Sequence, residues 1–105
     1  MFRINDIDWE ILFVSPSHPM LYRSDGSLTV GSCDNETRTI YLSDRLEGAF
    51  LRKVLCHEIT HAAMFSYGVK LTLEQEELLA DLLATYGNEI ISVTNKIFNK
   101  IKGGY

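Results

Sequence analysis

The pattern of apolar and polar side chains divides the chain into a strand-forming first half and a helix-forming second half. Residues 9–14, Trp-Glu-Ile-Leu-Phe-Val, form a β-rich run that stops at the breaker Ser-Pro-Ser-His-Pro. Residues 37–42 alternate in polarity, which places Ile40 and Leu42 on the same face of a strand. Residues 1–43 are therefore predicted to be mainly β.

Two turn signals lie between these runs. The dipeptide Asp25-Gly26, favoured in tight hairpins, separates the short apolar segments 21–23 and 28–30, which are predicted to pair as strands. The polar residues 34–36, Asp-Asn-Glu, mark a second turn before the strand at 37–42.

The second half, residues 44–102, has the apolar spacing of helices. Asp44 followed by Glu47 resembles a capping box, which predicts that a first helix begins near Arg45. Gly68 is a typical C-terminal stop for it. The apolar positions of this helix recur at helical spacing: Phe50, Val54, Ile59, Ala62 and Phe65.

Two further helices are predicted after a capping box formed by Thr72 and Gln75. The second helix has a wide apolar face, made by Leu78, Leu79, Leu82, Leu83 and Tyr86. Gly87 and the following Asn are expected to break or bend it. The stripe of residues 90–101 extends the pattern nearly to Gly103 and is expected to be core or an oligomer face. The whole is one α+β domain, residues 1–105.

Length and charge narrow the class of protein. A chain of 105 residues suits one modest core, and no apolar run approaches the ~20 residues that cross a bilayer. A net charge of −4 argues against nucleic acid as the main partner. Residues 1–6 lack the basic and apolar blocks of a secretory signal, and Cys33 and Cys56 show no disulfide pattern, so a cytoplasmic location is expected.

The first predicted helix contains the H-E-x-x-H sequence His57-Glu58-Ile-Thr-His61. Residues four apart lie on one helix face, so both imidazoles can reach the same ion, and zinc accepts neutral imidazole nitrogen. Glu58 lies next to that face, where it can act on a zinc-bound water without ligating the metal. One zinc ion and peptide-bond hydrolysis, with Glu58 as general base, are therefore expected.

A catalytic zinc site usually has three protein ligands, and the acidic second helix offers the third. Glu77 lies nearly opposite the leucine face and is the expected ligand, with Glu76 as its competitor. Asp81, one turn further, is expected to orient a histidine. The alternative is that these acids, with Glu74, only complement the helix dipole.

His57-Glu58-x-x-His61 followed by Glu77-x-x-x-Asp81 resembles the gluzincin branch of zinc metallopeptidases, and residues 28–91 resemble small phage-type and ImmA/IrrE-type metallo-endopeptidases. The pattern Glu-Ala-Asn-x-Phe-Ala, common in ImmA-type relatives, is missing. The resemblance implies a minimal zincin-like domain with a short antiparallel sheet, whose edge strand pairs with an extended peptide. Residues 37–42 are the expected edge. It also implies a repressor-like regulator as substrate.

Other interpretations stay open. The small size also suits a catalytically idle zincin-fold module that binds a regulatory protein. In a latent protease, the terminal helix or the tail 103–105 would occupy the cleft. Three residues are candidates for donating a hydrogen bond to the transition state: His18, Tyr67 and Tyr86. A histidine in a turn is more often a surface loop residue, and a tyrosine at such a position more often lies at the edge of the core. The oligomeric state does not follow from the sequence.

Overall fold

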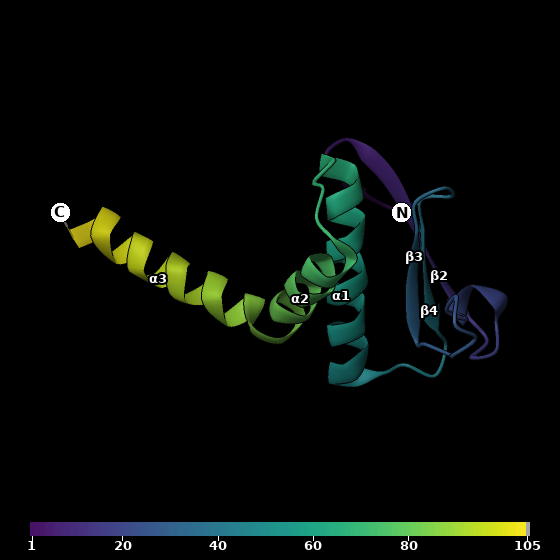
Figure 1. Ribbon diagram of the computed structural model, residues 1–105. Helices are drawn as coiled ribbons and strands as arrows, with labels where there is room; N and C mark the ends of the chain where they lie inside the picture. Colours follow the sequence, from purple (N-terminus) through teal and green to yellow (C-terminus); the bar gives the residue numbers. More distant parts are fainter. Residues whose placement is uncertain (105) are drawn as a thin grey trace.

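In the computed structural model, residues 1–104 are described, and a four-stranded sheet packs against a long helix in an α+β fold (Figure 1). The strands are β1 (Phe2–Ile4), β2 (Ile7–Val14), β3 (Gly31–Asp34) and β4 (Thr39–Ser43). The helices are α1 (Gly48–Tyr67), α2 (Leu73–Leu82) and α3 (Asn88–Gly104), with a 3-10 turn η1 (Pro19–Leu21) and a π-helical segment η2 (Leu83–Gly87). The predicted order of strands followed by helices is confirmed.

The sheet is mixed, so the prediction of an antiparallel sheet was wrong. The strand order is β1-β2-β4-β3, and β2 runs parallel to β4. The chain between β2 and β4 passes through a long segment and β3, which allows this direction, whereas a tight hairpin between the two strands would forbid it. β4 lies inside the sheet, so residues 37–42 are not its edge. The edges are β1 and β3.

The hairpin of β1 and β2 was not predicted. Asn5 and Asp6 join the strands and both have positive φ, 49° and 62°, as a type I′ turn requires. The Asn-Asp dipeptide between Ile4 and Ile7 was the available signal, because Asn and Asp tolerate this conformation better than other non-glycine residues.

Residues 21–23 and 28–30 meet in an antiparallel bridge from Tyr22 to Leu28 around the turn at Gly26, as the predicted hairpin requires, but they do not form regular strands.

One further local prediction was wrong and two are confirmed. α1 begins at Gly48 and has no side-chain cap from Glu47. The φ of +60° at Gly48 is incompatible with a helix interior, so the helix cannot begin earlier. The C-terminal stop at residue 68 and the capping box at residues 72–75 are present as predicted.

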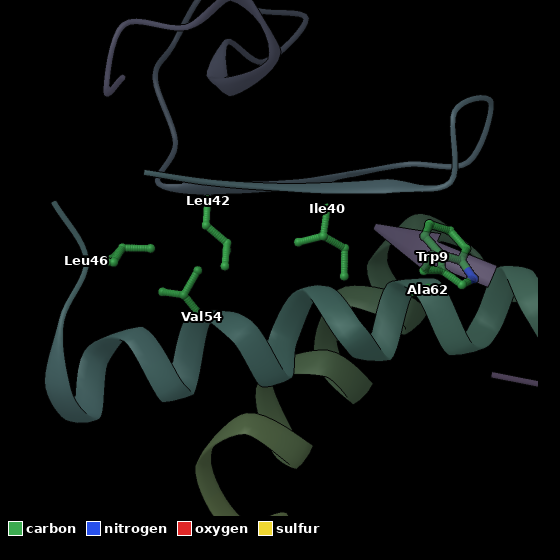
Figure 2. Packing of buried hydrophobic residues seen from close by; sticks show 6 residues of the cluster. All are labelled: Trp9, Ile40, Leu42, Leu46, Val54 and Ala62. Carbon is green, nitrogen blue, oxygen red and sulfur yellow. The ribbon is translucent and has the colours of Figure 1, made fainter. Parts of the chain in front are cut away.

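The core lies between the sheet and one face of α1 (Figure 2). It is a cluster of six buried side chains: Trp9, Ile40, Leu42, Leu46, Val54 and Ala62. The indole nitrogen of Trp9 donates a 2.8 Å hydrogen bond to Ser66 Oγ, which ties β2 to the last turn of α1. This packing fixes the rotation of α1 and therefore the direction in which its histidines point.

The predicted break or bend at Gly87 takes the form of a change in helix type, because the chain stays helical but a π-helical segment separates α2 from α3. η2 joins α2 to α3 in π geometry, and a side chain at Gly87 would lie 3.3 Å from Leu83. α3 projects away from the rest of the molecule (Figure 1). None of the helices within residues 1–104 has both the length and the apolar composition to cross a membrane.

Candidate metal centre

Helix α1 presents His57 and His61 from successive turns. Their Nε2 atoms lie 3.2 Å apart. Two nitrogens bound to one tetrahedral zinc at ~2.0–2.1 Å would lie about 3.3 Å apart, so this spacing already matches a shared ion. The match follows from the four-residue spacing on a rigid helix.

Helix α2 adds the carboxylate of Glu77 to this pair. Glu77 Oε1 lies 3.0 Å from His61 Nε2, and Glu77 Oε2 lies 3.2 Å from His57 Nε2. One ligand atom from each of the three residues lies within 4.8 Å of the others. His57, His61 and Glu77 therefore form a group that could hold a metal ion.

Each histidine has a second carboxylate at its outer nitrogen. Asp81 Oδ1 lies 2.9 Å from His57 Nδ1, and Glu76 Oε1 lies 2.5 Å from His61 Nδ1. A carboxylate in this position accepts the ring N–H and leaves the lone pair of Nε2 free for a metal. Asp81 thus lies where it was expected. Glu76, considered as a competing ligand, lies behind His61 instead.

Glu58 is buried, with 7% of its surface exposed, and faces β3. Gly31 makes room for it, because a Cβ at that position would lie 3.2 Å from Glu58 Cγ and 2.8 Å from Val54 Cγ1. Burial raises the pKa of the Glu58 carboxyl, against the opposing effect of His57 and His61. A carboxylate with a raised pKa holds a proton more readily, as a general base must.

These side chains share one open cavity of about 810 Å³ between α1, α2 and the β3 edge. Cys33 of β3 also lines it, and burial raises the pKa of its thiol to about 12, so the thiol stays protonated near neutral pH. Tyr22 and Arg23 line it from the loop that precedes β3. Sequence reasoning missed these two residues, since only a turn signal marked their segment.

The three other candidate donors lie elsewhere. His18 caps η1, where its Nδ1 accepts a 3.1 Å hydrogen bond from Met20 N, and its ring stacks on Tyr41. Tyr67 and Tyr86 are exposed and do not line the cavity. No residue of α3 within the described range lines it either. Tyr105, which ends the tail considered as a plug, lies outside the described residues.

Comparisons of the chain with protein-family models, with curated proteins and with solved structures found no match. The function is therefore inferred from the geometry of this centre. That geometry establishes that two imidazoles and one carboxylate from α1 and α2 lie close enough together to hold one ion.

Proposed function

We propose that the protein is a zinc-dependent metallo-endopeptidase of the small gluzincin type. The observation that carries this proposal is the buried Glu58 carboxylate lining the same open cavity as the His57, His61 and Glu77 group. Two neutral nitrogens and one carboxylate suit zinc, and three protein ligands leave a position for substrate or water. A purely structural zinc site has four protein ligands and no open position, so it does not need a carboxylate such as Glu58 beside it.

When bound, zinc supplies a Lewis acid that polarises the substrate carbonyl and lowers the pKa of a coordinated water to about 7. Glu58 takes a proton from the attacking water and returns it to the leaving amine. Asp81 and Glu76 hold the imidazoles of His57 and His61 with their Nε2 atoms toward Glu77, where an ion would be held. In this mechanism His57, His61 and Glu77 would hold the metal, and Glu58 transfers the proton.

The edge of β3 supports an extended peptide as the substrate. The carbonyl of Val30 accepts a hydrogen bond from Ser43 N. By the alternation of an antiparallel ladder, the backbone groups of Gly31 and Cys33 then point to the open edge. Both residues line the cavity beside Glu58, so a peptide added there as a strand runs across the centre. A repressor-like regulator of a phage or other mobile element is the protein substrate to test first.

The test is Glu58→Gln beside the wild type, both loaded with zinc. Glutamine keeps the volume of the side chain but cannot accept the proton, so peptide cleavage is expected to fall at least about 100-fold while one zinc per chain is retained. Glu74→Gln, an exposed acid in the first turn of α2 that does not line the cavity, is the matched control. Cleavage that persists in Glu58→Gln would overturn the assigned mechanism.

The same measurements separate the peptidase from a catalytically idle zinc-binding module that binds a regulatory protein. If the protein is an idle module, the wild type and Glu58→Gln hold zinc equally, and neither of them cleaves a candidate regulator. Binding of a regulator without turnover, with equal affinity in wild type and Glu58→Gln, would favour the idle module.

A further inference from the structure

A stripe of apolar side chains along α2, η2 and α3 is left uncovered by every element within residues 1–104. Its six members recur every three or four residues, and each is between 44% and 56% exposed: Leu82, Tyr86, Ile90, Val93, Ile97 and Ile101. Ile91 and Phe98 widen the stripe on α3 and are 58% and 59% exposed. The stripe is therefore not core, and the remaining expectation from the sequence is an oligomer face.

Helix α3 has little else to stabilise it. Within the described chain its substantial packing is against η2, and it extends from the body of the molecule (Figure 1). A 17-residue helix in water is only marginally stable without tertiary packing of its apolar face. Burial of the stripe against another surface would therefore stabilise α3.

The charges on α3 match a second copy of the same helix. Glu89 lies near its start, whereas Lys96 and Lys100 lie toward its end, and all three fall within about 40° on one flank of the stripe. In an antiparallel helix pair each flank meets the same flank of the partner with the ends reversed. Glu89 of one copy then faces Lys100 of the other, and two-fold symmetry repeats the pair.

We propose that α3 forms an antiparallel homodimer that buries the part of this stripe that lies on α3. Its six half-exposed side chains there, each on the order of 100 Å², provide about 600 Å² per copy, or about 1,200 Å² in total, which is the lower end of the range for a stable interface. The face of α3 opposite the stripe carries one charge, Lys102 in the last turn, beside the uncharged Asn88, Ser92, Asn95 and Asn99. Helices that lie on membranes instead carry many Lys and Arg residues there, so a second copy fits better than a lipid surface.

The first test measures the molar mass of the full chain by sedimentation equilibrium over a concentration series. The wild type is expected to be a dimer. Ile97→Asp places two carboxylates in the apolar interface and is expected to weaken the dimer roughly 100-fold or more. Asn95→Asp adds the same charge to the opposite side of the helix and should leave the dimer intact. Retained zinc binding in both variants shows that the rest of the fold is unaffected.

The second test addresses the antiparallel arrangement. Glu89→Lys and Lys100→Glu are each expected to weaken the homodimer about threefold to tenfold at low salt, because both symmetric pairs become repulsive. An equimolar mixture of the two variants should recover the wild-type affinity, since the heterodimer again contains two opposite-charge pairs. Added salt should reduce all of these differences.

A wild-type chain that stays monomeric at every concentration overturns the homodimer, including one whose α3 then binds anionic vesicles or a different protein. A dimer whose dissociation constant is unchanged by Ile97→Asp overturns the assignment of its interface to α3. A mixture of the charge variants that fails to recover overturns the antiparallel pairing.

Discussion

At the scale of residues, neighbouring acids of α2 take different positions around the two imidazoles. Glu77 faces both Nε2 atoms, whereas Glu76 and Asp81 lie at the outer nitrogens of His61 and His57. An acid at the outer nitrogen fixes the tautomer and the orientation of the ring before an ion arrives, and so favours binding.

Replacing the outer acids by amides of the same shape is expected to weaken zinc binding. Glu76→Gln and Asp81→Asn should each lower the affinity about 10- to 100-fold. Glu76→Gln should have the larger effect, because the Glu76 side chain is only 15% exposed whereas that of Asp81 is 69% exposed. Competition with a chromophoric chelator measures both affinities.

Glu74→Gln on the same helix serves as the control and should bind zinc as the wild type does. Unchanged zinc affinity in both amide variants would contradict the orienting role of these acids.

The sequence predicted which imidazoles meet, since a spacing of four residues on a helix leaves little freedom. It favoured Glu77 over Glu76 as the ligand, but it did not predict that Glu76 lies at the outer nitrogen of His61. Consecutive helix residues differ in direction by only about 100°, and a glutamate side chain is long enough to reach either ring nitrogen. The rotation of α2 against α1, where Ala80 is buried, makes the distinction, and that rotation is a tertiary property.

At the scale of elements, α2 places three acids of the centre within only ten residues, so its first turn must be held firmly. The capping box does this. Thr72 Oγ1 accepts a 3.1 Å hydrogen bond from Gln75 N, and Gln75 Oε1 accepts a 3.0 Å hydrogen bond from Thr72 N. Glu76 and Glu77 follow immediately.

Thr72→Ala is expected to lower the free energy of unfolding by about 1 kcal/mol, the usual value of such a cap. Zinc affinity should fall with it, because fraying of the first turn displaces Glu76 and Glu77. Thr85→Ala, at an exposed position of η2, is the control. Urea denaturation and zinc titration report the two effects. A loss of stability without any loss of zinc affinity would show that the cap does not position the acids.

For the strands, the sequence pattern predicted which side chains share a face but not how the strands pair. Alternation identified Ile40 and Leu42 as neighbours on one face, and both are fully buried. It could not identify the neighbouring strand or its direction. Both depend on the path of the chain between Val14 and Gly31, a segment that contains η1 and no regular strand. The three residues of β1 are too few to show a period at all.

At the scale of the whole molecule, the hydrophobic core attaches the sheet to α1, and the candidate metal centre lies where α2 meets the same helix. The buried core cluster contains only six side chains. A ligand that binds the folded chain and not the unfolded chain stabilises the fold in proportion to the logarithm of its concentration. Zinc should therefore contribute a large share of the stability of a domain this small.

Removal of zinc with a chelator is expected to lower the melting temperature. Zinc at 100 times its dissociation constant adds about 2.7 kcal/mol, and a domain of this size gains about 4–8 °C per kcal/mol. The shift should therefore be roughly 10–20 °C by calorimetry. His61→Ala should show no zinc-dependent shift. Equal melting temperatures with and without zinc in the wild type would contradict a site at His57, His61 and Glu77.

The parallel pairing of β2 with β4 has a consequence for the order of folding. It joins Glu10 to Thr39 and so requires closure of a long loop, whereas the metal-ligand candidates all lie within residues 57–81. Local contacts form before distant ones, since they cost less chain entropy. When the full-length chain refolds, the hairpin of α1 and α2 is therefore expected to form while the sheet is still open. Glu58 gains its buried environment only when Gly31 docks, so a refolding chain is expected to bring His57, His61 and Glu77 together before the pocket around Glu58 is complete.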